Sequence, residues 1–249
     1  MWKKISSILL TALLCLVCAV ASAQAAEDSA PRATAPQEKP SRIELVMILD
    51  KSGSMHGLEA DTIGGFNAMI EKEKKLGIDV RVTTVLFNDK MDRLYEHREI
   101  RSVRPLTERT YETGGTTALL DAVGDTILHM EQSGAADRQG TKVIVVIITD
   151  GMENASTEFT KAKVKELISD KQEKAGWDFI YLGANIDAAE EADAIGVRKA
   201  NAVTYKNTSS GVRANYDAVG VYVRSAPAAI RNPVRGRIMS KRMRRNKTD

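Results

Sequence analysis

The chain has 249 residues, enough for one domain of ordinary size with a well-buried core. Its 43% hydrophobic and 28% charged residues are close to globular averages, and its 5% aromatic residues argue against a surface that stacks nucleic-acid bases. The formal net charge is +3, but nine basic residues and a single acid lie from Arg224 to the end. An acidic body with a basic tail is not typical of a nucleic-acid-binding domain, so we expect no nucleic-acid partner.

Residues 1–25 have the order of a secretory signal peptide. Two lysines near the start precede an apolar run, Ile8–Val20, and small residues follow it. This order predicts export to the periplasm or out of the cell, with cleavage after Ala23 or Ala25. An uncleaved membrane anchor is the alternative, although the run is shorter than the about 20 residues that a membrane span needs.

Both cysteines, Cys15 and Cys18, lie inside this signal segment. The mature chain would therefore contain no thiol, which excludes cysteine catalysis and cysteine-based metal sites. Residues 26–41 contain three prolines among small and charged residues and have no apolar stripe. They are predicted to be a linker.

Strand-like and helix-like segments alternate between residues 42 and 223. In chain order they are the strand Ile43–Leu49, the helix Thr62–Lys75, the strands Val80–Phe87 and Asp92–Val103, the helix Ala118–Met130, the strand Lys142–Thr149, the helix Lys161–Lys174, the strand Trp177–Leu182, the helix Ala188–Ile195, the strand Ala202–Tyr205 and the helix Ser209–Val223. The alternation predicts an α/β domain with an open, mostly parallel, doubly wound (Rossmann-like) sheet and helices on both faces. Residues 224–249 have no apolar periodicity and are predicted to be a disordered basic tail.

Three polar loops occur where this sheet would place the carboxyl ends of its strands or open the following helix. They are Asp50-Lys51-Ser52-Gly53-Ser54, Gly114-Gly115-Thr116-Thr117 and Thr149-Asp150-Gly151. Ligands of open α/β sheets bind at this edge. The loops offer two carboxylates and three hydroxyls as candidate metal ligands, namely Asp50, Asp150, Ser52, Ser54 and Thr116. Oxygen ligands of this kind suit Mg²⁺, with Mn²⁺ or Ca²⁺ as alternatives.

In this order, the three loops resemble the metal-ion-dependent adhesion site of von Willebrand factor A domains, and the resemblance covers roughly residues 42–223. The register of the motif favours Thr116, directly after Gly115, over Thr117. The resemblance implies a non-catalytic protein-binding module of an exported bacterial type, expected to be a monomer. An Asp or Glu carboxylate of the partner would complete the metal coordination.

The same resemblance implies a role for each predicted ligand. Ser52 and Ser54 would bind the metal directly, and Thr116 would bind it directly in one state and through water in another. Asp50 and Asp150 would act mainly through water and position the other ligands. Taken singly, each of these residues is equally typical of a turn or a helix cap.

Two other functions compete with this interpretation. A phosphatase-like or hydrolase enzyme could use Asp50 as a phosphoryl acceptor, but haloacid dehalogenase-like phosphatases need a second Asp where Ser52 stands. No recognisable catalytic motif surrounds His56, His97 or His129. In the second alternative, the basic tail contacts an anionic envelope surface and tethers the protein there.

Overall fold

A computed structural model describes residues 42–75, 77–206 and 208–229. Within them, strands and helices alternate as the sequence predicts, and the doubly wound α/β fold is confirmed. The predicted signal peptide, its cleavage site, the linker 26–41 and the tail from residue 230 onward lie outside the described residues.

The sheet contains six strands in the order β3-β2-β1-β4-β5-β6. They are β1 (Arg42–Asp50), β2 (Asp79–Phe87), β3 (Met91–Glu99), β4 (Thr141–Thr149), β5 (Asp178–Ala184) and β6 (Ala202–Tyr205). All neighbouring strands are parallel except the edge strand β3, which runs antiparallel to β2. The chain winds outward from β1 to β3 and then returns to β4. The strand order therefore reverses between β1 and β4, and a crevice is expected at the carboxyl ends of these two strands.

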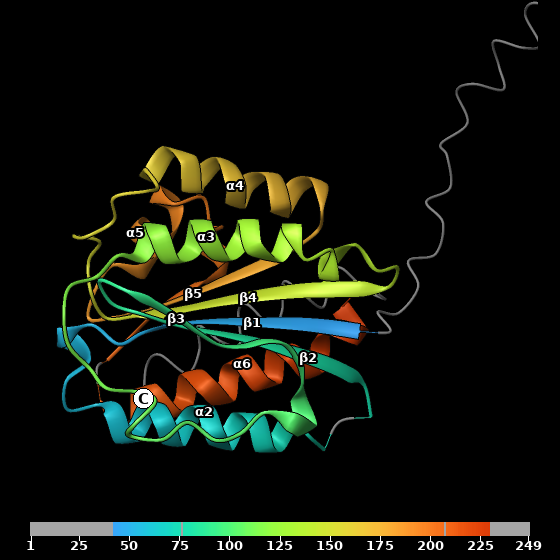
Figure 1. The fold of residues 1–249 in the computed structure, drawn as a ribbon, viewed down its shortest axis with the longest axis horizontal. Coiled ribbons are helices and arrows are strands. Elements are labelled where there is room, and N and C mark those ends of the chain that lie inside the picture. The colour runs from blue at the N-terminus through green and yellow to red at the C-terminus, as the bar shows by residue number, and fades with distance from the viewer. Residues whose placement is uncertain (1–41, 76, 207, 230–249) are drawn as a thin grey trace, which may run out of the picture. The chain divides into compact units, whose positions relative to one another are not determined.

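Helices cover both faces of the sheet (Figure 1). The helices α2 (Glu59–Glu73) and α6 (Ser209–Ala229) pack on one face, and α3 (Leu119–Gln132), α4 (Lys161–Lys174) and α5 (Ala188–Ala194) on the other. Four short 3-10 helices complete the described part of the chain: η1 (Gly53–Met55), η2 (Ile100–Ser102), η3 (Ala135–Asp137) and η4 (Lys199–Asn201). No helix among the described residues combines the length and apolar character that crossing a membrane requires.

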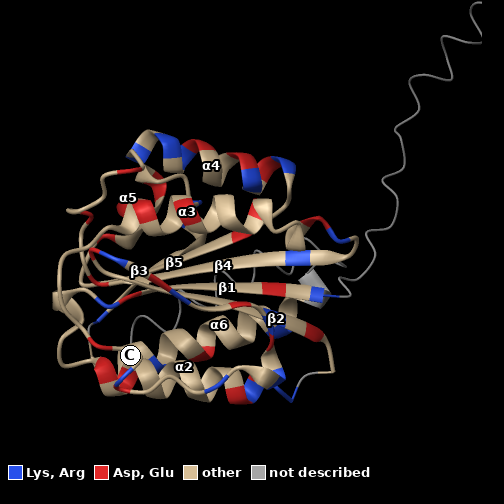
Figure 2. Ribbon diagram, viewed as in Figure 1, with Lys and Arg blue, Asp and Glu red and all other residues tan. Residues whose placement is uncertain are grey.

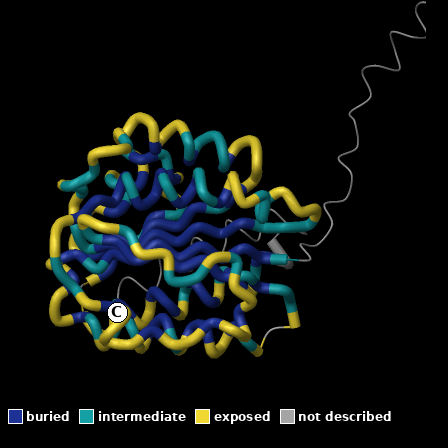
Figure 3. Tube along the Cα trace, viewed as in Figure 1, coloured by how far each residue is buried: buried dark blue, intermediate teal, exposed yellow. Residues whose placement is uncertain are grey.

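Burial follows the layers. The central strands are buried along most of their length, and exposed residues lie on the outer sides of the helices (Figure 3). Charged residues lie on the helices, along the edge strand β3 and near the ends of other strands, whereas the middle of β1 and β4 carries none (Figure 2). Both central strands are apolar at nearly every position because helices cover them on both faces.

Most predicted boundaries fall within three residues of the structure, and two differ by more. The strand predicted over Asp92–Val103 ends at Glu99, because the chain turns into η2 and buries Ile100. The last helix continues past Val223 to Ala229, so the predicted start of the tail falls inside α6. Arg224 belongs to this helix because its guanidinium donates a hydrogen bond to the fully buried Glu73 carboxylate of α2.

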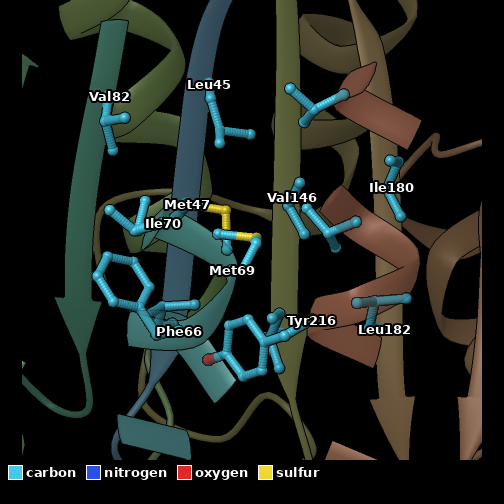
Figure 4. Close-up of a cluster of buried hydrophobic side chains, with 14 of the residues drawn as sticks. Leu45, Met47, Phe66, Met69, Ile70, Val82, Val146, Ile180, Leu182 and Tyr216 are labelled. Carbon is cyan, nitrogen blue, oxygen red and sulfur yellow. The ribbon is translucent and has the colours of Figure 1, made fainter. Parts of the chain in front are cut away.

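The core between α2, α6 and the sheet depends on a close approach of the two helices (Figure 4). The rings of Phe66 and Tyr216 meet edge to face, with centroids 6.5 Å apart. Gly65 makes this approach possible, because a Cβ atom at this position would overlap the Tyr216 ring. The neighbouring Gly64 has no other atom within 4 Å of an added Cβ.

This difference predicts opposite effects for two adjacent substitutions. Gly65→Ala should lower the free energy of unfolding by about 1–3 kcal/mol, because overpacking pushes the helices apart. Gly64→Ala is the matched control and should raise it by about 0.5–1 kcal/mol, because a helix loses less entropy with Ala than with Gly. Urea denaturation measures both. Equal effects of the two variants would show that the helices do not meet at Gly65.

Candidate metal centre

Side chains from two distant loops meet at the carboxyl edge of the sheet. The Ser52 and Ser54 hydroxyl oxygens are 3.1 Å apart, and the Ser54 hydroxyl donates a 2.6 Å hydrogen bond to Oδ1 of Asp150. Ser54 and Asp150 are 96 positions apart in the sequence. They meet because β1 and β4 are adjacent parallel strands that end at the same edge. The crevice expected at this edge thus contains four of the five predicted ligands, counting Asp50 at the end of β1.

The carboxylate of Asp50 is buried and held on both sides. Its Oδ1 accepts the Ser52 backbone N–H at 2.6 Å, and its Oδ2 accepts the Thr149 hydroxyl at 2.6 Å. The Tyr111 hydroxyl donates to the Asp50 carbonyl. Burial raises the pKa of Asp50 above its ordinary value, the hydrogen bonds from Thr149 and Ser52 oppose the rise, and the charge of Asp150 adds to it. A cation nearby would favour the ionised form of this carboxyl group.

The structure places Thr117, and not Thr116, beside these oxygens. Thr116 is exposed, whereas Thr117 is 3% exposed. The Thr117 N–H donates to Oδ1 of Asn154 at 2.9 Å, and its carbonyl accepts the Asn154 N–H at 3.0 Å. These two bonds fix the backbone so that Thr117 faces inward, and no contact is found between Thr116 and the other predicted ligands. The register of the motif favours Thr116 as the ligand, whereas the structure brings Thr117 next to the other oxygens.

Gly151 leaves an opening among the oxygen atoms. A Cβ atom added to it would lie 2.8 Å from Oγ1 of Thr117, 3.3 Å from Oγ of Ser54 and 3.5 Å from Oδ2 of Asp50. Three oxygens from two separate loops therefore surround the space that a side chain at Gly151, in the third loop, would enter.

Residues after β2 complete the frame of the site, and the sequence analysis missed them. The Asn88 side chain donates to the Gly114 carbonyl at 2.8 Å, and the Asn88 carbonyl accepts the Ala118 N–H at 2.8 Å. Gly115 has φ +76°, and an added Cβ would collide with Asp89. The rule that ligand loops follow parallel strands could have identified this pair, because β2 ends at the same edge.

The loop after β4 is anchored to the start of α3. The Glu153 carboxylate accepts the Leu120 N–H at 2.8 Å. In the opposite direction, Asp121 accepts three backbone N–H groups of the loop at 2.8–3.0 Å, those of Thr157, Glu158 and Phe159. Asp121 is thus a packing and capping partner of the loop after β4. Its bonds hold the Thr117 loop and the Asp150 loop together.

The donor set fits a hard cation. Among residues 42–75, 77–206 and 208–229, no three His, Cys, Asp or Glu side chains converge as a metal site would require. The cluster offers hydroxyl and carboxylate oxygens instead, which are the ligands that Mg²⁺ and Mn²⁺ accept. Lys51, the cation nearest in sequence, pairs with Asp92 at 2.6 Å. A lysine therefore does not neutralise the two carboxylates from within the loop.

Comparison with protein families gives one match. The model of the von Willebrand factor type A domain matches residues 44–215, more than half of the chain. No curated protein matches the chain in sequence.

Several solved structures share the fold. Proximal thread matrix protein 1 from the mussel byssus, in a structure with a zinc-occupied adhesion site, gives a TM-score of 0.53 at 15% identity over 75% of this chain and 47% of that chain. The PilB minor pilin from Streptococcus sanguinis, as a point mutant, gives 0.56 at 10% identity over 76% and 62%. The domain of the type V pili tip protein Mfa5 from Porphyromonas gingivalis gives 0.50 at 12% identity over 74% and 95%. The chain thus spans about half the length of the mussel protein. At such identities the likeness shows the fold alone.

The opening at Gly151 predicts the effect of filling it. Gly151→Ala should lower the affinity for Mg²⁺ at least about tenfold while the circular dichroism spectrum stays unchanged, because the added methyl enters the space among the oxygens. Gly53→Ala is the matched control, because its Cβ would lie 3.4 Å from the nearest atom, an ordinary contact. Isothermal titration with MgCl₂ compares the two variants. Parental affinity in Gly151→Ala would mean that the ion does not bind at this opening.

Proposed function

Because the chain belongs to the von Willebrand factor type A domain family, we propose that its three loops bind one divalent cation and that the bound cation recruits a partner protein. The observation that carries the proposal is the meeting of oxygens from the first two loops around Gly151 of the third. Ser52, Ser54 and Thr117 would supply hydroxyl ligands. Asp50 and Asp150 would hold these hydroxyls and the waters of the ion in position.

The chemistry of the ligands favours Mg²⁺, with Mn²⁺ or Ca²⁺ as alternatives. Hydroxyl oxygens and water are hard, weakly charged ligands, and the three loops contain no histidine or cysteine. Zinc occupies the adhesion site of the mussel protein, which shows that this fold can hold it there. The lack of soft ligands here supports a harder ion for this chain.

A cation bound mainly by neutral hydroxyls keeps much of its positive charge. A carboxylate from a partner would then bind more strongly than in an exposed surface ion pair, which contributes about 0–1 kcal/mol. Met152, two residues after Asp150, is 63% exposed. It is one of only two large hydrophobic residues classed as exposed in the described part of the chain. Methionine is common at protein-binding surfaces, so Met152 is a candidate contact for an apolar side chain of the partner. An acidic residue flanked by an apolar one is the partner feature that fits both groups.

The proposed location follows from the amino-terminal segment. Its signal-peptide pattern supports export to the periplasm or out of the cell, where the module would serve adhesion or assembly. Two of the similar structures come from pilus proteins, which supports the same role.

The geometry favours binding over catalysis. A nucleophilic Asp50 would need an accessible oxygen, but the residue is 1% exposed and both of its oxygens accept hydrogen bonds. The three histidines each lie next to a carboxylate: His56 next to Glu59, His97 next to Glu44 and His129 next to Glu96, and none of them forms a hydrogen bond with Ser52 or Ser54. No described histidine is therefore in place to activate a serine.

A pair of isosteric substitutions tests which threonine binds the ion. Thr117→Val should weaken Mg²⁺ binding by about tenfold to a hundredfold, because it removes a hydroxyl without changing the shape of the side chain. Thr116→Val should bind Mg²⁺ like the parent. Titration calorimetry gives both affinities. The reverse result would restore Thr116 as the ligand.

Metal removal tests the binding function. The immobilised protein should retain a partner from envelope or culture extracts in Mg²⁺ and release it in EDTA, and Asp50→Ala should retain none in either buffer. Thr116→Val should behave like the parent and serves as the control. Retention that persists in EDTA would separate partner binding from the metal and contradict the proposal. Normal Mg²⁺ affinity in Asp50→Ala would contradict the assignment of the site.

A further inference from the structure

A second cleft lies at the edge strand β3, formed by residues that the metal centre does not use. It has a volume of about 370 Å³ and is lined by Tyr95, Arg98, Ser102 and Arg104. Two guanidinium groups, a hydroxyl group and an aromatic ring thus share one hollow. None of these residues belongs to the three metal-site loops.

A β-bulge brings the first two lining residues to the same face of the sheet. In the pairing of β2 with β3, Thr84 is opposite Tyr95 and Val82 is opposite Arg98. An advance of two residues along β2 therefore corresponds to an advance of three residues along β3. In a regular strand, residues three apart point to opposite faces. The extra residue of the bulge shifts the alternation of side chains between the two faces by one position. As a result, Tyr95 and Arg98 both face the side of the sheet that α2 covers. Tyr95 accordingly packs against the core on that side.

Specific contacts hold the bulge in place. His97, inside it, has φ +45°, a left-handed conformation that is unfavourable for a residue with a side chain. Its N–H donates to the Thr83 hydroxyl at 3.1 Å, and its Nδ1 lies 3.1 Å from Oε2 of the buried Glu44. Such conformations persist only where the surroundings impose them, and they are concentrated at functional sites.

The bulge also turns acidic side chains away from the cleft. Glu96 lies 3.4 Å from Nε2 of His129 on α3, across the sheet from Tyr95. Glu99 pairs in register with Arg81, which in turn is the neighbour of Glu44 on the α3 side. The α2 side of this strand therefore presents Arg98 without an adjacent carboxylate from its own strand.

The second half of the cleft is equally well anchored. In the segment after β3, Ile100, Val103 and Leu106 are buried, and the residues between them are exposed. The Tyr95 hydroxyl donates to the Arg104 carbonyl at 3.0 Å. The side-chain amide of Asn67 on α2 forms two hydrogen bonds with the backbone of Leu106: it accepts the N–H at 2.7 Å and donates to the carbonyl at 3.0 Å. Arg104 is therefore carried by a backbone that is fixed on both sides.

The two arginines of the cleft have no carboxylate partner among the described residues. Five other described arginines do have one, among them Arg42 with Asp79 and Arg213 with Asp61, whereas exposed arginines such as Arg101 do not. We propose that the cleft between β3 and the segment 100–106 binds the phosphate group of a ligand, through the guanidinium groups of Arg98 and Arg104 and the hydroxyl of Ser102. Arginine matches the oxygens of phosphate with paired hydrogen bonds. The volume exceeds the need of a bare ion and leaves room beside the Tyr95 ring for the group that carries the phosphate.

The test compares the parent with the double variant R98Q/R104Q, by NMR titration in EDTA so that the metal centre stays empty. Inorganic phosphate and phenyl phosphate serve as probes, and acetate at equal ionic strength serves as the reference anion. We expect both phosphates to shift the signals of residues 95–104, with phenyl phosphate binding more tightly, and the double variant to bind each at least about tenfold more weakly. Tighter binding of inorganic phosphate would instead identify the free ion as the ligand.

Arg101→Gln is the matched control, because Arg101 is exposed in the same segment but does not line the cleft. It removes the same charge and should bind like the parent. Equal losses in the control and the double variant would reduce the effect to general charge and overturn the proposal, as would equal shifts with acetate. Asp50→Ala should keep full phosphate binding, so the result does not depend on the proposed metal site.

Discussion

Burial of the Asp50 carboxylate at the end of β1 is the interaction on which the arrangement of the loops depends. A charged group removed from water must be compensated, and here the Ser52 N–H and the Thr149 hydroxyl each donate to one of its oxygens. The first bond shapes the loop after β1, and the second ties that loop to the end of β4. These two strands flank the point where the strand order reverses. The Asp50 carboxylate therefore lies where the topology predicts a ligand site.

Two glycines occupy positions where a Cβ atom would overlap a neighbouring group, one in the core and one at the candidate metal centre. Gly65 lets α2 approach Tyr216 of α6, and so sets the thickness of one layer of the domain. Gly151 lets Thr117, Ser54 and Asp50 surround an open space. In both places a methyl group would occupy a volume that another element needs. Small residues at these positions are therefore consequences of packing and not of flexibility.

The candidate metal centre and the cleft beside β3 differ in how they are built. The metal centre draws its oxygens from loops that meet through parallel strand pairing, so its geometry depends on the whole sheet. The cleft beside β3 depends on one irregularity of an edge strand, the bulge at His97, and on the segment that follows it. Edge strands tolerate such irregularities because they have only one neighbour to pair with. The two regions are therefore expected to act independently.

The sequence alone determined the fold and identified most of the residues that meet at the candidate metal centre. Apolar runs bounded by polar turns located the central strands, and helical periodicity located the covering helices within a few residues. The Asp50-x-Ser52-x-Ser54 spacing and the Thr149-Asp150-Gly151 turn identified loops that do meet in space. These features are legible in one dimension because hydrophobic period and strand-end position follow from local chain geometry.

Only the tertiary structure decided which threonine faces the cluster, where the strand β3 ends and how far α6 extends. The choice of Thr117 rests on backbone hydrogen bonds to Asn154, which is 37 positions away. The bulge rests on a contact between His97 and Glu44, 53 positions apart, and the end of α6 on Arg224 reaching Glu73, 151 positions away. Contacts over such separations have no local signature, because the partner becomes a neighbour only when the sheet and helices have packed.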